Sequence, residues 1–444
     1  MTALSGWGRF PTHETELLTP PTLAASRDLL ARHSGLVARG NGRAYGDAAI
    51  GTRVTLATEN LNRMRRFDPA TGSLTVEAGV LLSDILSAFV PRGFFPPVVP
   101  GTKLVSVGGM IAADVHGKNH HRDGGFGKHV EQLTLALPGG EVATCSPTEQ
   151  PDLFAATVGG MGLTGTILEA TFRLKPIGTG LMRQRTIVAP DLDAAMDALV
   201  ESDRSTYSVA WIDCLARDKS LGRSLVFAAE HASSSEVQAL KPGSEDFPQR
   251  RGGRLAVPLE LPGFALNGLS VRAFNEVYFR RGSIHAGDPF LVHWEPYFFP
   301  LDGIGSWNRI YGKRGFLQHQ CVIPEAPARA VLADILELVS SGGNASFLAV
   351  LKRLGGSFGT MAFPMEGFTL ALDLRMRDGV FQLLDRIDRL VTAAGGRLYL
   401  AKDARQSRAT FEAGYPGLAR FRDLRRAIGA EHAIVSRLSA RLGI

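Results

Sequence analysis

The segment from Pro100 to Gly127, PGTKLVSVGGMIAADVHGKNHHRDGGFG, constrains the fold of this chain more than any other. It contains seven glycines, three histidines and two lysines. Glycines at this density let backbone N–H groups approach a ligand because no Cβ intervenes, and consecutive exposed N–H groups bind anions. A short apolar run, Met110–Ala113, leads from the first glycines into a polar cluster. This order favours a bound cofactor with a diphosphate and a reactive ring over a series of ordinary turns.

Several other segments carry motifs of the same kind. An earlier glycine loop, ARGNGRAYGD, spans 38–47 and follows a short apolar run. Neither loop has the G-x-G-x-x-G spacing that opens a βαβ unit, which argues against a Rossmann NAD site. The remaining motifs are GWGR at Gly6–Arg9, GGMGLTG at Gly159–Gly165, SWNRIYG at Ser306–Gly312, FLQHQCVIP at Phe316–Pro324 and GGRLYLAKDAR at Gly395–Arg405.

Together these motifs resemble the vanillyl-alcohol-oxidase-type flavoproteins and, among them, the decaprenylphosphoryl-β-D-ribose 2-oxidase family. HGKNHH and LYLAKD are the specific motifs, and the resemblance covers essentially the whole chain. It implies an α+β fold with a PCMH-type FAD-binding domain over residues 1–177 and an inserted α+β substrate domain over 178–394. The substrate domain is expected to be an antiparallel sheet flanked by helices. Residues 395–444 are expected to return to the FAD domain.

Hydrophobic periodicity supports this mixture of elements. It predicts helices over 17–33, 326–340 and 379–394, and strands over 36–39, 208–213, 347–351 and 369–374. A length of 444 residues exceeds what one ordinary core accommodates, so two domains are expected. The stretch 241–254 is polar and contains Pro and Gly, which is typical of a loop.

The resemblance implies a set of FAD-binding residues that includes both glycine loops. From the first loop these are Ala38, Arg39, Gly40, Asn41, Gly42, Arg43, Ala44, Tyr45, Gly46 and Asp47. From the second they are Gly101, Ser106, Val107, Gly108, Gly109, Ala113, Asp114, Val115, His116 and Gly117, and Ile167 and Tyr399 complete the set. Many relatives attach FAD covalently through a histidine of the first loop. This chain has Ala44 there, between Arg43 and Tyr45, so FAD is expected to be non-covalent.

Three residues are candidates for the chemistry: Lys402, His116 and Gln318. Lys402 ends the apolar run LYLAK, interpreted as strand-like, where a charged side chain needs a partner. That partner is either the cofactor and substrate or a carboxylate, Asp403 or Asp373. The histidines at 116, 120 and 121 have no carboxylate or Cys at ligand spacing, so no metal is expected.

Five further residues are candidates for contact with substrate: Lys118, Gln320, Lys352, Phe298 and Asp373. Gln318 and Gln320 alternate with Leu317, His319 and Cys321, so both amides point to one face of a strand and need partners, which sugar hydroxyls would supply. Lys352, in LAVLKRLG, is suited to a phosphate. Phe298 stands where the family has tyrosine, and Ala371 where it has cysteine.

The resemblance implies an FAD-dependent oxidoreductase acting on a lipid-linked sugar. It would oxidise the C2 hydroxyl of a polyprenyl-phosphoryl pentose to the 2-keto sugar, the first half of an epimerisation to arabinose for cell-wall arabinan. A separate NAD(P)H-dependent keto-reductase would complete the epimerisation. The alternative enzyme is a soluble FAD-dependent alditol or aldonolactone oxidase that uses oxygen. A nucleic-acid-binding or lipid-surface-binding protein is the alternative of another class.

Composition and charge bear on partners and location. With 45% hydrophobic and 21% charged residues the chain has a globular composition. The net charge is +6, and residues 385–444 carry twelve Lys/Arg against six Asp/Glu. This excess is either a solvated helical surface or an attractor of phosphates at an anionic membrane, and aromatic residues do not interleave with it as nucleic-acid binding requires. No signal peptide, transmembrane segment or cysteine pattern is evident, so a cytoplasmic protein with three buried thiols is expected.

Overall fold

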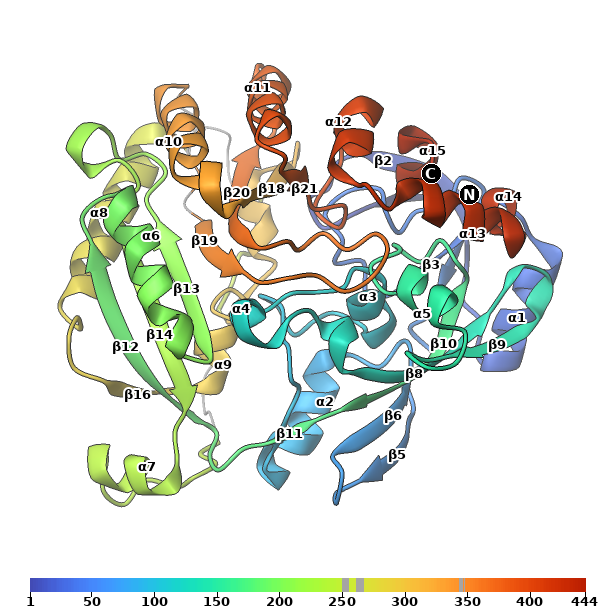
Figure 1. Ribbon diagram of the computed structural model, residues 1–444, viewed down its shortest axis with the longest axis horizontal. Coiled ribbons are helices and arrows are strands. Elements are labelled where there is room, and N and C mark those ends of the chain that lie inside the picture. Colours follow the sequence, from blue (N-terminus) through green and yellow to red (C-terminus); the bar gives the residue numbers. More distant parts are fainter. Residues whose placement is uncertain (250–254, 261–266, 343–345, 347) are drawn as a thin grey trace.

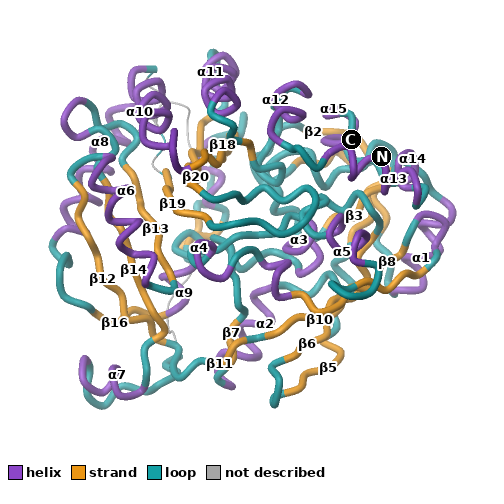
Figure 2. Tube along the Cα trace, in the orientation of Figure 1, coloured by secondary structure: helices purple, strands orange, loops and turns teal. Residues whose placement is uncertain are grey.

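The computed structural model describes residues 1–249, 255–260, 267–342, 346 and 348–444. Two sheet-based parts lie side by side in Figure 1, with the large sheet and its helices in one part and two smaller sheets in the other. Loops make up much of the region where the two parts meet (Figure 2). Helices and antiparallel sheets are both abundant, so the predicted α+β class is confirmed.

The first small sheet brings the N-terminus together with the first glycine loop. Its strand order is β1-β2-β4-β3, with β1 and β2 antiparallel and β4 parallel to both β2 and β3. The bounds are β1 (Thr2–Ser5), β2 (Thr12–Leu18), β3 (Leu36–Arg39) and β4 (Val54–Ala57), with α1 (Leu23–Arg32) before β3. The glycine loop follows β3 directly.

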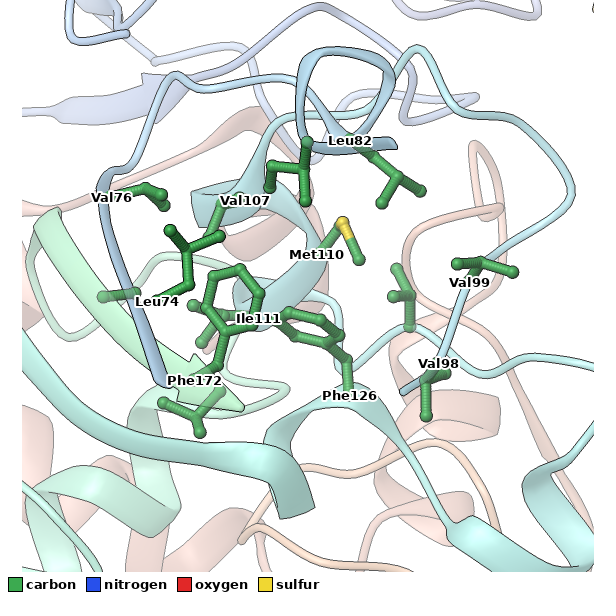
Figure 3. Packing of buried hydrophobic residues seen from close by; sticks show 14 of the residues in the cluster. Leu74, Val76, Leu82, Val98, Val99, Val107, Met110, Ile111, Phe126 and Phe172 are labelled. Carbon is green, nitrogen blue, oxygen red and sulfur yellow. The ribbon is translucent and has the colours of Figure 1, made fainter. Parts of the chain in front are cut away.

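The second small sheet is antiparallel, in the order β5-β6-β10-β8-β9. Its strands are β5 (Met64–Asp68), β6 (Ser73–Glu77), β8 (Val130–Ala136), β9 (Val142–Cys145) and β10 (Thr166–Arg173). The helices of this part are α2 (Leu82–Phe89), α3 (Val107–Ala112), α4 (His120–Asp123) and α5 (Pro151–Thr157), and β7 (Phe94–Phe95) pairs with β11 (Lys175–Pro176). Figure 3 shows Val107, Met110 and Ile111 of α3 turned into the apolar cluster beside this sheet, which holds the second glycine loop in place.

The large sheet has eight strands in the order β16-β12-β14-β13-β19-β20-β18-β21, and all its pairs are antiparallel. Its strands are β12 (Leu181–Ala189), β13 (Tyr207–Ile212), β14 (Ser224–His231), β16 (Phe290–His293), β18 (Phe316–Pro324), β19 (Ala349–Leu354), β20 (Gly367–Arg375) and β21 (Arg397–Leu398). The helices of this part are α6 (Leu192–Glu201), α7 (Ser234–Leu240), α8 (Gly268–Ser283), α9 (Trp294–Phe298), α10 (Glu325–Ser341) and α11 (Val380–Ala393). A parallel pair, β15 (Leu255–Ala256) with β17 (Ile304–Gly305), lies beside it.

The two faces of the large sheet differ in character because side chains alternate along each strand. One face packs against α6, α10 and α11 through an apolar cluster that includes Leu317, Cys321, Leu370 and Leu372. The opposite face carries the intervening residues of β18, β19 and β20. The register places Gln318 opposite Asp373, Gln320 opposite Ala371 and Lys352 opposite Thr369. Polar side chains from three adjacent strands therefore share one face.

The C-terminal helices lie against the first small sheet. They are α12 (Arg408–Gly414), α13 (Leu418–Ala427), α14 (Ala430–Ala433) and α15 (Arg437–Leu442). Their apolar residues share a cluster with Leu36 of β3 and Leu56 of β4. The buried Arg425 side chain connects the segment at Leu163 with the end of α14. Its Nε donates to Leu163 O at 3.1 Å, and its Nη2 donates to Ile434 O at 2.7 Å.

Most of the periodic elements are confirmed, and one is wrong. The helix predicted over 17–33 begins only at Leu23, because residues 12–18 form β2 and Thr22 caps the helix by accepting from Ala25 N. Strands 208–213 and 369–374 and helices 326–340 and 379–394 are confirmed within two residues at each end. Residue 347 of the predicted strand 347–351, and 250–254 of the predicted loop, lie outside the described residues. Cys145, Cys214 and Cys321 are buried free thiols, as expected.

The domain boundaries at 177/178 and 394/395 stay predictions. The chain leaves the second small sheet after β10 and enters the large sheet at β12. It leaves the large sheet again after β21, which pairs Leu398 with Cys321.

Candidate active site

The two glycine loops touch each other. A Cβ on Gly40 would lie 2.0 Å from Ser106 Oγ, so only glycine fits the observed approach. Asn41 Nδ2 donates to Leu104 O at 2.8 Å and ties the first loop to the second. Ser106 caps α3 by accepting from Gly109 N at 3.3 Å. The loops thus form one cradle from segments about sixty residues apart in the chain.

A third segment, residues 399–405, closes on the first loop. Tyr45 N donates to Ala401 O at 2.9 Å, and a Cβ on Gly46 would lie 2.0 Å from Asp403 O. The strand interpretation of LYLAK is wrong at its end: β21 stops at Leu398, and Lys402 lies in a turn in which its N–H donates to Tyr399 O. The turn carries Lys402 to the first glycine loop.

The end of the second loop is held by Asp114. This residue has a φ of +37°, and its Oδ1 accepts from Gly127 N at 2.9 Å. Burial raises the pKa of Asp114 to about 7, and its Oδ2 has no described partner. Asp114 fixes the turn into His116, and the neighbouring Ala113 O accepts from Tyr399 OH at 2.8 Å.

His116 sits at the centre of an aromatic and polar group. It is 7% exposed, and its ring centroid is 5.0 Å from that of Tyr399 and 5.5 Å from that of Phe363. Its Nε2 lies 2.8 Å from Gln320 Nε2. Burial, reinforced by Lys352, holds the pKa of His116 well below its usual range, so the ring is neutral near pH 7.

Three lysines lie around this group. The Lys402 ammonium is 3.8 Å from the Tyr45 ring centroid, a cation–π distance. Burial lowers the pKa of Lys402, and the Asp373 carboxylate opposes that shift. Burial lowers the pKa of Lys352 to about 8 and that of Lys118 to about 7, with the charge of Lys352 adding to the shift at Lys118. Lys118 Nζ donates to Tyr297 O.

Gln318 and Asp373 form a pair on the polar face of the sheet. Gln318 Nε2 donates to Asp373 Oδ1, and Tyr311 OH donates to Asp373 Oδ2 at 3.4 Å. Burial raises the pKa of the Asp373 carboxyl. The protein therefore satisfies part of the hydrogen bonding that we assigned to sugar hydroxyls from sequence.

The other predicted residues differ in how they contact the site. Arg39 donates to Ser5 O at 2.8 Å, Arg43 lies 4.0 Å over the Trp7 ring with its Nε unpartnered among described residues, and Asp47 pairs with Arg441 at 3.0 Å. Phe298 is buried, with its ring 4.9 Å from Tyr207 and 5.9 Å from Lys118 Nζ. Ala38 lies in β3, no described atom lies within 4 Å of a Cβ placed on Gly101, Val107 and Gly108 begin α3, and Val115, Gly117 and Ile167 are buried.

A small cavity connects several of these groups. Its volume is about 20 Å³, and its lining includes Gln318, Gln320, Tyr399 and Lys402. A larger cavity of about 880 Å³ lies between α10, α11 and residues 217–221, and none of the predicted site residues lines it. The small cavity therefore joins residues from LYLAKD and FLQHQ, and the contact of Gln320 with His116 adds the HGKNHH motif.

Sequence reasoning missed two residues of the site. Thr369 accepts from Gln320 Nε2 at 3.1 Å, and Phe363 stacks on Tyr399 at a centroid distance of 4.6 Å. Thr369 was within reach of the period-two pattern, because it precedes Ala371 and Asp373 on the same face of β20. Phe363 lies in the irregular segment between β19 and β20, where no pattern applies.

The cradle fits FAD on its own geometry. In the first loop the backbone N–H groups of residues 40–44 donate to no described residue and remain for a diphosphate, whereas those of Gly108 and Gly109 donate to Ala78 O and Ser106 Oγ. Several of the buried polar atoms that have no partner among the described residues lie in the two loops, including Arg43 Nε, Asp114 Oδ2 and His116 Nδ1. The aromatic and basic group beside them suits a reactive ring that becomes negatively charged.

Comparison with known proteins agrees. Residues 19–146 match the FAD binding domain family, which spans both loops. The chain is an FAD-dependent oxidoreductase.

Its family follows from full-length similarity. The chain is 35% identical to decaprenylphosphoryl-beta-D-ribose oxidase of Mycolicibacterium smegmatis, over 99% of this chain and 97% of that protein. It is 35% identical to an uncharacterized Streptomyces coelicolor protein over 82% of this chain and all of that protein. It is 28% identical to D-arabinono-1,4-lactone oxidase of Yarrowia lipolytica over 36% of this chain and 31% of that enzyme. The chain belongs to the decaprenylphosphoryl-β-D-ribose oxidase family.

Proposed function

We propose that this protein oxidises the C2 hydroxyl of a polyprenyl-phosphoryl pentose of the decaprenylphosphoryl-β-D-ribose type to the 2-keto sugar. The observation that carries the proposal is the shared polar face of β18, β19 and β20. It sets Gln318, Gln320 and Lys352 beside His116 and Lys402, next to the glycine cradle. The similarity to the Mycolicibacterium enzyme covers 99% of this chain, so it includes both the glycine cradle and the strands of that face. It supports the same substrate class.

Lys352 is suited to the substrate's phosphate. Its side chain has no hydrogen bond to a described residue, and its charge acts on His116, Lys118 and Lys402. Three lysines act on this region, and its carboxyl Asp373 already accepts from Gln318 and Tyr311, so an anion is the complementary ligand for the lysines. A phosphodiester between sugar and lipid supplies that anion, whereas a free alditol or lactone does not.

Lys402 is placed to hold positive charge at the cofactor. It lies between the Tyr45 ring and the Asp373 carboxylate, on a turn tied to the first glycine loop. Bound FAD would accept the hydride leaving C2. The hydroxyl proton passes to a basic group of the site, and Lys402 stabilises the negative charge that the hydride brings.

Substrate deuterated at C2 tests this assignment. We expect the flavin still to be reduced, but at a slower rate. The keto product should have lost the deuterium. An unchanged rate together with deuterium still at C2 of the product would place the oxidation elsewhere on the sugar.

The 2-keto product needs a second enzyme if the outcome is arabinose. We infer that a separate NAD(P)H-dependent keto-reductase returns hydride to C2 from the opposite side. Adding such a reductase and NADPH to the oxidation should convert ribose substrate to the arabinose epimer. Accumulation of ketone alone under those conditions would contradict the proposal that a keto-reductase completes the epimerisation.

We also propose that α8 contacts an anionic membrane that presents the lipid substrate. Leu269, Val277 and Ile284, in and directly after this helix, are 79%, 65% and 77% exposed, and exposed Arg272 and Arg281 flank them. An apolar face bordered by arginines complements an anionic lipid surface. No helix among the described residues has the length and apolar run needed to cross a bilayer.

The position of α8 suits this contact better than the basic C-terminus does. Tyr278 of α8 packs on Trp211 at 4.8 Å, and Trp211 is opposite Val350, on the face that carries Lys352. The C-terminal arginines are already engaged: Arg405, Arg408, Arg420, Arg422, Arg426 and Arg441 form ion pairs. The solvated-surface interpretation therefore fits them, and α8 is the better candidate.

Flotation with vesicles tests the contact. The holoenzyme should bind phosphatidylglycerol vesicles more than phosphatidylcholine vesicles, and Val277→Glu should reduce binding. Lys313→Glu is the control, since Lys313 is exposed and lies outside α8. Equal binding by wild type and Val277→Glu would remove α8 from the interaction.

A further inference from the structure

Hydrogen bonds connect His116 through Gln320 and Thr369 to Cys321, and only one assignment of donors and acceptors fits them all. Thr369 Oγ1 donates to Cys321 O at 2.8 Å. A hydroxyl has one proton, so Thr369 Oγ1 must accept from Gln320 Nε2, which lies 3.1 Å away. The amide nitrogen of Gln320 is thereby turned toward Thr369, and the same nitrogen lies 2.8 Å from His116 Nε2.

This assignment of donors and acceptors determines the proton position on His116. An amide nitrogen only donates, so His116 Nε2 accepts. A neutral imidazole carries one proton, and that proton must then sit on Nδ1. His116 Nδ1 is buried without a partner among described residues, on the side away from Gln320.

The surroundings keep the ring neutral and the network in place. Gln320 and Thr369 are 5% and 1% exposed, so water does not compete for these bonds. The charged and titratable groups acting on His116 are Lys352, Lys402 and His120, all basic. His120 does not change the proton position on His116, because the Nδ1 of His120 is already occupied: it accepts from Gly355 N at 3.1 Å.

We propose that Thr369 is a positioning residue that, through Gln320, fixes His116 as the Nδ1–H tautomer. His116 then presents a hydrogen-bond donor, and not a lone pair, to the cofactor and substrate. The proton of the substrate hydroxyl must accordingly go to a group other than His116. The tautomer follows from the hydrogen bonds alone, and only the identity of the atom that accepts from Nδ1–H rests on the proposed function.

Nitrogen-15 NMR of histidine-labelled holoenzyme reads the tautomer directly, without substrate. His116→Asn assigns the signals by their loss. Wild type should show a protonated Nδ1 and an unprotonated Nε2. Gln320→Glu, whose carboxylate accepts only, should move the proton to Nε2.

Thr369 variants test the positioning role. Thr369→Val keeps the shape but removes the acceptor, so the Gln320 amide can rotate and a mixture of tautomers should result, with flavin reduction about tenfold slower. Thr369→Ser should restore both the wild-type spectrum and the rate. Thr186→Val is the matched control, because Thr186 accepts from Gln184 Nε2 at 3.2 Å in β12 of the same sheet, away from His116.

Two results would overturn the proposal. One is a wild-type spectrum with the proton on Nε2. The other is a Thr369→Val spectrum that keeps Nδ1 fully protonated. If Thr369→Val fails to fold, the wild-type and Gln320→Glu spectra still decide. Inactivity toward every prenyl-phosphoryl pentose would refute the proposed function and leave the tautomer assignment standing.

Discussion

Lys402 is a buried cation that lies over the Tyr45 ring, with the Asp373 carboxylate acting on its charge. Lys402→Met keeps the length of the side chain and removes its charge beside Tyr45. We expect the variant to fold and bind FAD but to lose about 100- to 1000-fold in flavin reduction, the usual effect of removing one preorganised charge-stabilising group. Stopped-flow absorbance measures the rate, with Lys313→Met as the control. A rate near wild type would exclude Lys402 from the chemistry.

Lys352 is held at a cost to stability. Burial lowers its pKa from 10.5 to about 8, so the folded protein binds this proton more weakly than the unfolded chain. Protonated Lys352 therefore destabilises the fold below pH 8, and the penalty fades as the pH rises from 8 toward 10.5. Lys352→Met should raise the free energy of unfolding at pH 7 by about 1–3 kcal/mol, while raising KM for a phosphorylated substrate.

Denaturation of the substrate-free holoenzyme at several pH values checks this sign. The difference between Lys352→Met and wild type should shrink between pH 8 and 10.5. A variant that is less stable than wild type at pH 7 would show that Lys352 is satisfied by the protein.

Ala44 bears on how FAD is held. The position that resembles a covalent attachment site is Ala44, which has no nucleophile. Acid precipitation should release the flavin into the supernatant. Yellow colour that stays in the washed pellet would contradict non-covalent binding.

Residue types in apolar runs predicted much of the site but not its connections. Lys352 and Lys402 stood out because a lysine in an apolar run needs a reason, and both lie at the site. Thr369 did not stand out, because a threonine is ordinary in a strand and its role depends on β18 pairing with β20 and on Gln320 of β18 contacting His116. Such adjacency comes from strand order, which the local sequence does not encode.

At the scale of elements, the glycines determine how three loops meet. Gly46 approaches Asp403 O so closely that a Cβ would lie 2.0 Å away. Gly46→Ala should push the 399–405 turn from the first loop, at about 1–3 kcal/mol of stability, and should weaken FAD retention. Gly268→Ala is the control, since no atom of the described residues beyond its own chain neighbours and helix backbone lies within 4 Å of its Cβ position. Flavin content after gel filtration is the measurement, and equal content in both variants would show that the loops move independently.

Elements with a strong period were predictable, and those set by neighbours were not. Helix 379–394 and strand 369–374 follow from their apolar spacing. The helix predicted over 17–33 was wrong because Leu17 and Leu18 pair with Thr55 and Leu56 in β2–β4, a parallel contact between residues 38 positions apart in the chain. The strand interpretation was wrong at the end of LYLAK for a similar reason, because the turn at 399–402 is fixed by its bonds to the first loop.

At the scale of the molecule, β19 of the large sheet lies beside α4 of the other part (Figure 1). The contact between Gln320 and His116 joins the polar face of the sheet to the end of the second glycine loop. The glycine cradle holds the FAD that serves as oxidant, and we propose that the polar face of the sheet recognises the phosphate and the sugar. The resemblance in the sequence indicated both halves. Which side chains face each other across the junction required the structure, because His116 and Gln320 are separated by 204 residues.

Anaerobic reduction of the bound flavin is the most direct test of the central claim. The holoenzyme is mixed without oxygen with a prenyl-phosphoryl ribose, its dephosphorylated analogue, a free alditol or an aldonolactone, and the visible flavin absorbance is followed. We expect rapid bleaching by the prenyl-phosphoryl ribose and slow or no bleaching by the others. Bleaching by the free alditol or lactone as fast as by the lipid-linked sugar would contradict this expectation.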